Sequence, residues 1–183
     1  MSSVSIAGDT SGSILLAAPA IAGSSTVTLP TTGGTVRTTT TSGTVLQIVQ
    51  SSMTGQITTT STSFIATGLS ASITPSSSSN KILVTVMLNN TRCNNAGHIF
   101  ATVYRNGSNL APSGPSGLAQ SFYAMYCPSG VEIQGNGNIS YLDSPSSTSA
   151  VTYAVYYGVD GGSTSAINWN GQTSYIQLME IAA

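Results

Sequence analysis

The chain has 183 residues, and only 5% of them are charged, with four Lys or Arg, five Asp or Glu and a formal net charge of −1. Soluble domains carry about 25% charged residues, yet 40% of this chain is hydrophobic, which argues against a disordered protein. Four basic residues cannot form a basic nucleic-acid-binding surface, so we expect no nucleic-acid partner.

No targeting or membrane segment is indicated near the start of the chain. Residues 1–9 contain neither the basic region nor the apolar run of a signal peptide. The apolar stretch at residues 14–22 includes Pro19 and is shorter than the roughly 20 residues that span a bilayer. We therefore expect synthesis in a cytoplasm and no membrane insertion.

Residues 1–43 differ in composition from the rest of the chain. They are rich in Gly, Ser, Thr, Ala and Pro, lack aromatic residues and contain two charges, Asp9 and Arg37. Their apolar pieces are too small to build a core. The pattern predicts an extended β arm whose short strands pair with another surface or another copy of the chain. The apolar pieces are residues 4–6, 14–16 and 27–29.

Residues 44–183 read as a series of short strands separated by loops of Ser, Pro, Gly and Asn. Asn106-Gly107 is a strong hairpin signal. No segment shows a sustained helical period, and this spacing is typical of an antiparallel β-sandwich or jelly roll. The predicted strands are residues 44–50, 56–60, 63–68, 81–89, 98–105, 118–127, 138–143, 151–159 and 174–181.

Two of these strands, residues 81–89 and 151–159, are apolar or aromatic at successive positions. For residues 81–89 this pattern predicts a central strand that is buried on both faces. With so few charges, the remaining surface is not dispersed by electrostatic repulsion. We therefore predict self-association as a three-fold trimer, with a dimer as the alternative.

Candidate chemistry is sparse. Cys93 and His98 could form a nucleophile–base pair, but no orienting third group is indicated. Cys93, His98, Cys127 and Asp143 could bind zinc, but they lack the usual ligand spacing. The two cysteines allow one disulfide, and we favour buried free thiols instead.

Paired carboxylates for glycoside hydrolysis could be drawn from Glu132 with Asp143, or from Asp160 with Glu180. Such pairs are easily chosen from any five acidic residues, so the signal is weak. We expect no catalytic residue, no metal, no cofactor and no enzymatic activity.

Aromatic side chains could instead stack on sugars. We favour packing in the core or between subunits, because tyrosines at alternate strand positions usually pack. Trp169 lies in the polar stretch 168–171 and is the best candidate for an exposed contact. The others are Tyr123, Tyr126, Tyr141, Tyr153, Tyr156 and Tyr157.

Several segments together resemble structural proteins of tailed phages, namely the virion appendage or fibre-type proteins of marine and cyanobacterial phages. These segments are residues 6–23, 26–30, 43–50, 67–75, 80–84 and 176–181. The resemblance implies a β-rich, trimeric virion component whose N-terminal part docks on the particle. It supplies no catalytic residues.

The leading hypothesis is therefore a non-enzymatic virion protein, either a short fibre, a knob or a capsid decoration, assembled in the host cytoplasm. Residues 1–43 would bind other virion proteins, and residues 44–183 would form the β-sandwich and self-associate. The alternative is a receptor-binding module of a tail fibre that recognises a host-surface glycan. A polysaccharide-degrading enzyme is the third hypothesis.

Overall fold

The computed structural model describes residues 3–7, 13–17, 42–111 and 119–183, and the chain divides into two compact units, Met1–Val36 and Arg37–Ala183. In the first unit, strands β1 (Ser3–Ala7) and β2 (Ser13–Ala17) pair antiparallel. This pairing lies within one chain, whereas the sequence analysis expected pairing with another surface or another copy. The apolar piece at residues 27–29 lies outside the described residues.

The second unit is built almost entirely of strands, as predicted. Its one helical element among residues 42–111 and 119–183 is a short 3₁₀ turn, η1 (Trp169–Gly171). The predicted strand at 138–143 is longer, and β12 was not predicted. The strands are β3 (Val45–Thr54), β4 (Ile57–Thr59), β5 (Ile65–Ile73), β6 (Lys81–Asn94), β7 (Gly97–Arg105), β8 (Ser108–Asn109), β9 (Tyr123–Cys127), β10 (Glu132–Asp143), β11 (Val151–Val159), β12 (Thr164–Ile167) and β13 (Thr173–Ile181).

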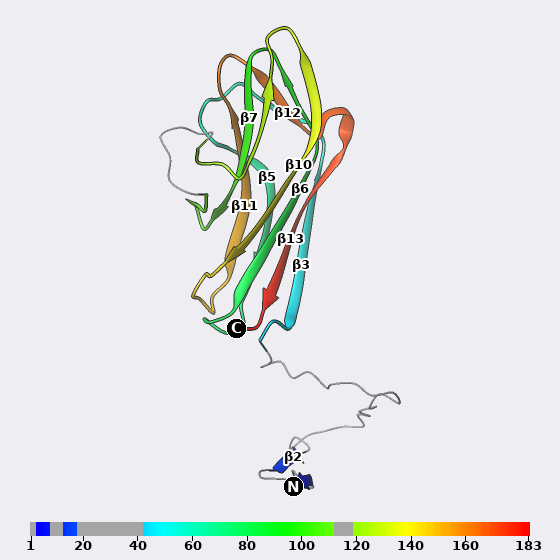
Figure 1. Ribbon diagram of the computed structural model, residues 1–183, viewed down its shortest axis with the longest axis vertical. Helices are drawn as coiled ribbons and strands as arrows, with labels where there is room; N and C mark the ends of the chain where they lie inside the picture. Colours follow the sequence, from blue (N-terminus) through cyan, green and yellow to red (C-terminus); the bar gives the residue numbers. More distant parts are fainter. Residues whose placement is uncertain (1–2, 8–12, 18–41, 112–118) are drawn as a thin grey trace. The chain divides into compact units, whose positions relative to one another are not determined.

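Two antiparallel sheets pack face to face in this unit (Figure 1). The first sheet has the order β3-β13-β6-β10, and the short strands β12 and β4 extend it beside the second half of β6. The second sheet has the order β5-β11-β7-β9, with β8 beside the end of β7. The pairs β3 with β13, β5 with β11, β6 with β10 and β7 with β9 are nested along the chain. This nesting is the arrangement of a jelly roll.

The two ends of this jelly roll meet through backbone hydrogen bonds. Gly43 N donates to Ala182 O at 2.8 Å, and Ala182 N donates to Thr44 O at 2.9 Å. The β6–β7, β9–β10 and β11–β12 connections lie at the opposite end of the sandwich (Figure 1). Loops that are distant in sequence therefore gather at one end, away from the C-terminus.

The core lies between the inward faces of the two sheets. The prediction that residues 81–89 are buried on both faces is wrong for a single copy of the chain. Met87, on the second face of β6, is 47% exposed. The reason is geometric, since a two-layer sandwich has no third layer to cover the outer face of a sheet. Fully buried side chains on β6 and β11 are Ile82, Val84, Val86, Leu88, Tyr153, Val155 and Tyr157.

A bulge changes the facing of β6 half-way along its length. Asn90 has a φ of 47°, and the pairing with β10 shifts register between Gly135 and Gly137. The Oδ1 atom of Asn136 accepts the Asn90 N–H at 2.9 Å. Beyond the bulge, Cys93 faces the core, whereas its neighbours on either side face outward.

A buried carboxylate ties three segments together near the C-terminus. Glu180 is 0% exposed, and its Oε1 accepts hydrogen bonds from Asn80 Nδ2 at 2.6 Å and from Ser76 N at 2.7 Å. Its Oε2 accepts from Gln47 Nε2 at 2.6 Å. Burial raises the pKa of Glu180, but the hydrogen bonds from Asn80, Gln47 and Ser76 outweigh burial and hold the pKa below its usual range. The β5–β6 connection is thereby fixed to β3 and β13.

We expect Glu180→Gln to lower the free energy of unfolding by about 2 kcal/mol at pH 7, because the amide places an N–H group against these donors. A lowered carboxyl pKa stabilises the fold above the pKa of the unfolded chain, and that contribution is lost as the pH falls through the folded-state pKa. The difference in the free energy of unfolding between the wild type and Glu180→Gln, measured by urea unfolding, should therefore be smaller at pH 3 than at pH 7. An equal Glu180→Gln effect at both pH values would contradict this account.

Candidate interaction surfaces

An apolar row crosses the outer face of the first sheet. Register places Ile48 beside Met179, Met179 beside Leu83, and Leu83 beside Leu142. Cross-strand partners share one face of a sheet, so these four side chains form a continuous row over β3, β13, β6 and β10. Ile48 is 56% exposed and Leu142 is 48% exposed, so both ends of the row are open.

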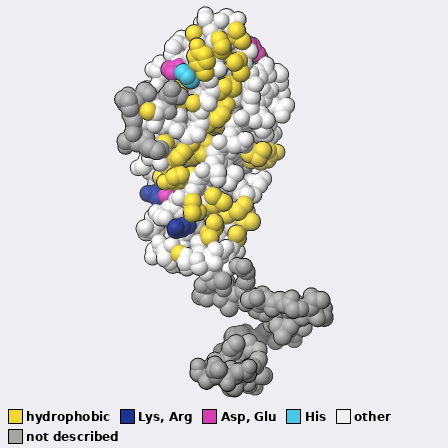
Figure 2. All heavy atoms as spheres, in the orientation of Figure 1, with side chains coloured by type: hydrophobic (Ala, Val, Ile, Leu, Met, Phe, Trp, Pro, Cys, Tyr) yellow, Lys and Arg dark blue, Asp and Glu magenta, His cyan; other side chains and the backbone are white. Residues whose placement is uncertain are grey.

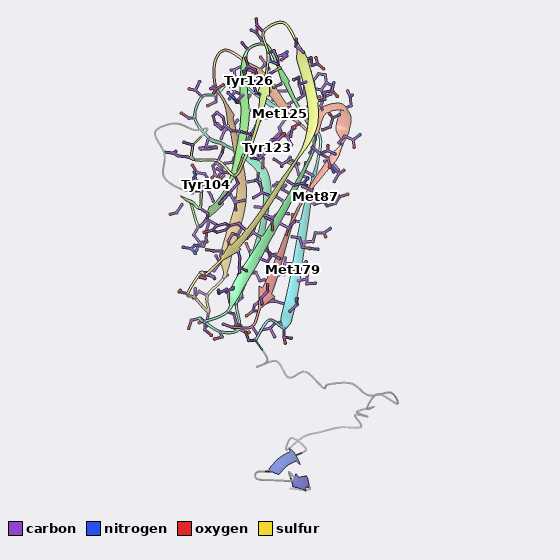
Figure 3. All side chains as sticks on the ribbon, in the orientation of Figure 1. Met87, Tyr104, Tyr123, Met125, Tyr126 and Met179 are labelled. Atoms are coloured by element: carbon purple, nitrogen blue, oxygen red, sulfur yellow. The ribbon has the colours of Figure 1, made fainter. Side chains whose placement is uncertain are left out.

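The next two rows complete this surface. Gln50, Gln177 and Thr85 form a polar row, followed by a row that contains Tyr175 and Met87. A shallow hollow of about 260 Å³ lies between them and is lined by these same five residues. Figure 3 places Met87 and Met179 on neighbouring strands of this sheet.

Charged side chains are scarce on this part of the surface. Register assigns Lys81 to the outer face, whereas Asp143 and Glu180 on the same strands are buried. Figure 2 shows groups of hydrophobic side chains over β6 and β13, and a longer stripe of them beside β10 that reaches the loop end. Five of the seven large hydrophobic side chains exposed in the described part of the chain lie here, which makes it the main unpartnered surface. We call this surface the apolar face; it comprises Val45, Ile48, Leu83, Met87, Leu142, Tyr175 and Met179.

Two long edge strands border the apolar face. β3 pairs with β13 along one side, and β10 pairs with β6 along one side. Within the residues that the structure describes, neither strand has a hydrogen-bonded strand on its other side. Long open edges favour strand addition or association between copies.

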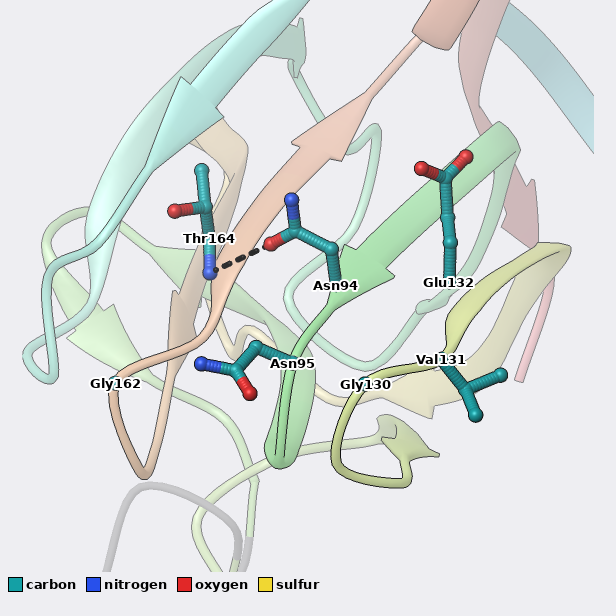
Figure 4. A pocket seen from close by; sticks show the side chains of 7 residues that line it. All are labelled: Asn94, Asn95, Gly130, Val131, Glu132, Gly162 and Thr164. Atoms are coloured by element: carbon teal, nitrogen blue, oxygen red, sulfur yellow. Dashed lines mark hydrogen bonds between the residues drawn. The ribbon is translucent and has the colours of Figure 1, made fainter.

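A second surface feature lies at the loop end of the sandwich (Figure 4). It is a hollow of about 460 Å³ formed by the β6–β7, β9–β10 and β11–β12 connections and the adjoining strand ends. We call it the loop-end hollow. It is lined by Asn94, Asn95, Gly130, Val131, Glu132, Gly162 and Thr164.

An ion pair borders the loop-end hollow. Arg92 donates to Glu132, and the Arg92 guanidinium lies 3.9 Å from the centre of the Trp169 ring. The hydrogen bond from Arg92 lowers the pKa of Glu132, and a second hydrogen bond, from Gln134, lowers it further. The same bond with Glu132 raises the pKa of Arg92. Trp169, the best candidate for an exposed contact in the sequence, is half-buried, and the Arg92 guanidinium covers part of its ring.

Cys93 and Cys127 come together from opposite sheets as buried, unbridged thiols. Cys127 Sγ lies 3.0 Å from Cys93 O and 2.9 Å from Val131 O, and either carbonyl can accept its one S–H proton. Burial and the hydrogen bond with Cys127 raise the pKa of Cys93 to about 12. A thiol with so high a pKa carries little thiolate at neutral pH, so it is a poor nucleophile and metal ligand.

His98 is paired with Asp160 rather than with Cys93. The His98 Nδ1 lies 2.9 Å from Asp160 Oδ2, and the ring packs 5.0 Å from that of Tyr126. Asp160 also accepts the backbone N–H of His98. At Gly97, a Cβ would lie 2.3 Å from Asp160 O, so only glycine permits this approach. The His98–Asp160 pair therefore links the start of β7 to the β11–β12 connection.

The predicted carboxylate pairs are not assembled. Glu132 and Asp143 lie at opposite ends of β10, about 36 Å apart along an extended strand. Asp143 accepts from Arg105 at 2.9 Å and from the Tyr153 hydroxyl at 2.7 Å. Glu180 and Asp160 have the separate partners described above. The described residues hold no cluster of three or more His, Cys, Asp and Glu that could bind a metal.

Most of the predicted aromatic residues serve packing. Tyr153 and Tyr157 lie in the core, and burial raises the pKa of Tyr157 to about 12. Tyr126 is 54% exposed, on β9. The other aromatic contacts are Tyr123 Oη with Thr91 Oγ1 at 2.9 Å, Tyr141 with Phe122 at 5.0 Å and Tyr156 stacked on Tyr104 at 4.0 Å.

The sequence analysis missed both surfaces. Alternation along residues 174–181 separates Met179 from the core residues, and this signal could have marked Met179 as outward. Asn94 and Asn95 carry no motif, because they meet the β10 and β12 residues only in the folded chain. No helix in the described residues is long and apolar enough to cross a membrane. No protein-family model matches the chain, and neither does any curated protein.

We expect alanine at Cys93, Cys127 or His98 to change stability and nothing else. Each replacement should lower the free energy of unfolding by about 1–3 kcal/mol, since it removes buried packing at Cys93 or Cys127, or the His98–Asp160 pair. Urea unfolding measures the loss, and elemental analysis of the purified wild type should show no stoichiometric zinc. Bound zinc that disappears in all three variants would contradict the structural role assigned to these residues.

Proposed function

We propose that this chain is a non-enzymatic structural component of a phage particle, either a short fibre, a knob or a capsid decoration. In this proposal the jelly roll self-associates through its apolar face, and residues 1–43 bind other virion proteins. The observation that carries the self-association is the apolar row from Ile48 to Leu142. The assignment to a virion is supported by the sequence resemblance to phage appendage proteins.

The physical balance favours covering the apolar face with a second copy. Burying apolar surface yields about 25 cal/mol per Å², and a stable interface buries about 800 Å² on each partner. Desolvation costs little here, because Lys81 is the one charged side chain assigned to the described part of this face. The 260 Å³ hollow beside Met87 and Tyr175 offers a place for a side chain of the partner.

A ring of three copies is the proposed assembly. Gly43 is bonded to Ala182 at the chain-end side of the sandwich, so each copy begins its β domain at the same end. Three copies related by one axis would release three arms at that end together. β1 and β2 pair within one arm, and arms that lie together could also pair the outer edges of these strands with one another.

The self-association can be tested by placing charge on the apolar row. We expect the wild-type chain to sediment as three copies of 18.5 kDa at micromolar concentration. Ile48→Lys with Leu142→Lys should give a folded monomer, because six lysines would meet in the trimer. The matched control is Ala66→Lys with Ser70→Lys, two exposed sites on β5 of the second sheet, which should leave the trimer intact.

A wild-type monomer would overturn the proposal, and a wild-type dimer would overturn the three-fold stoichiometry. Trimers that persist in the Ile48→Lys, Leu142→Lys variant would show that the interface does not lie on the apolar face. Circular dichroism of each variant confirms that the β domain remains folded.

Deletion of residues 1–43 tests the attachment role. We expect the remaining chain to fold, because the sandwich core and the Glu180 network lie within β3–β13. The truncated protein should be absent from purified particles when it is supplied in place of the full chain. Normal incorporation of the truncated protein would contradict attachment through the arm.

A further inference from the structure

We propose that the loop-end hollow binds a neutral carbohydrate. This site is separate from the apolar face, and the inference does not rest on the proposed virion function. It is carried by the side chains that three strands and their connections bring to one place (Figure 4).

A row of polar side chains forms one wall of the hollow. Register places Asn94 of β6 between Thr164 of β12 and Glu132 of β10. The row therefore spans two strand spacings, or about 10 Å. The bulge at Asn90 turns this row outward, because it reverses the facing of the second half of β6. An amide, a hydroxyl and a carboxylate thus stand side by side on the outer face.

The groups in the hollow can both donate and accept hydrogen bonds. Asn94 Oδ1 accepts the Thr164 N–H at 3.2 Å, which leaves the Asn94 amino group to donate into the hollow. Asn95 is exposed, and its side-chain amide has no hydrogen-bond partner among the described residues. Glu132 is oriented by Arg92 and by Gln134, whose Nε2 donates at 2.8 Å. Sugar hydroxyls both donate and accept, so they match this set.

The charge of the hollow favours a neutral ligand. Glu132 is its single lining carboxylate, and Arg92 offsets that charge. A divalent cation would need more oxygen ligands of the carboxylate type than the lining provides. An anion would face Glu132 without a free cationic partner. Val131 is 46% exposed beside these polar groups and offers an apolar contact for the C–H face of a sugar ring.

The size and position of the hollow also suit a glycan. Its volume of about 460 Å³ lies within the range of small-molecule sites, about 300–1,000 Å³. It lies at the loop end of the sandwich, opposite the C-terminus (Figure 1). A ligand there could extend into solvent, as a chain of sugars requires.

The experiment is a titration of the full chain, labelled with ¹⁵N, with the methyl glycosides of glucose, galactose, mannose and N-acetylglucosamine. We expect at least one glycoside to shift the backbone amide signals of Asn94, Asn95 and Thr164. Saturation-transfer difference spectra identify the sugar protons in contact. Calcium chloride is titrated separately, without sugar.

Two variants and one control define the site. Asn95 has a φ of 68°, so Asn95→Gly keeps its backbone conformation and removes the amide. Thr164→Val keeps the side-chain shape and removes the hydroxyl. Each should weaken binding about tenfold, the equivalent of one hydrogen bond. Asn170→Gly is the matched control, because Asn170 has a φ of 61°, is exposed and does not line the hollow. Its affinity should equal that of the wild type.

If none of the four glycosides shifts these amide signals, the inference is overturned. Equal binding by Asn95→Gly, Thr164→Val and the control would also overturn it, as would shifts caused by calcium alone. Sedimentation of Asn95→Gly separates the two proposals, since loss of sugar binding should leave self-association unchanged.

Discussion

A strand in a two-layer sandwich has one face for the core and one for the outside, and the outer surface of this jelly roll depends on that constraint. On β6 the inward residues are fully buried, whereas Met87 on the other face is 47% exposed. The same alternation on β3, β13 and β10 sets Ile48, Met179 and Leu142 in one row. Most globular proteins place Lys and Glu at such positions. Here a hydrophobic row remains, and we propose that a second copy of the chain covers it.

The few charged side chains are used inside the fold or at its joints. Glu180 is held by neutral donors, Asp143 by Arg105 and the Tyr153 hydroxyl, and Asp160 by His98. Each of these contacts joins segments that are distant along the chain. In the described residues, these carboxylates therefore help to hold the fold together.

Local pattern was enough to predict the class of fold and most strands, because alternation and turn residues act over short distances. The order of strands within the jelly roll, and the pairing of β3 with β13 across the whole domain, depend on long-range contacts that no local pattern encodes. The two-sided burial predicted for residues 81–89 was wrong, since apolar residues on an outward face look identical in sequence to residues covered by a third layer. The bulge at Asn90 was also missed. An Asn tolerates a positive φ, and the second residue of both Asn-Asn pairs, Asn90 and Asn95, adopts one. The pair alone does not distinguish a bulge within a strand, as at Asn90, from a turn between strands, as at Asn95.

The bulge links the two surfaces to one structural cause. Before Asn90, the outward residues of β6 include Leu83 and Met87, which contribute to the apolar face. After Asn90 the facing reverses, and Arg92 and Asn94 point outward beside Glu132 and Thr164. Without the reversal, Cys93 would face solvent and Asn94 would be buried without its present partners, at the cost of an unpaired polar group. A single long strand therefore carries an apolar half suited to another copy of the chain and a polar half suited to hydroxyl groups. The two halves can be occupied together, because they lie on successive stretches of β6 rather than on the same one.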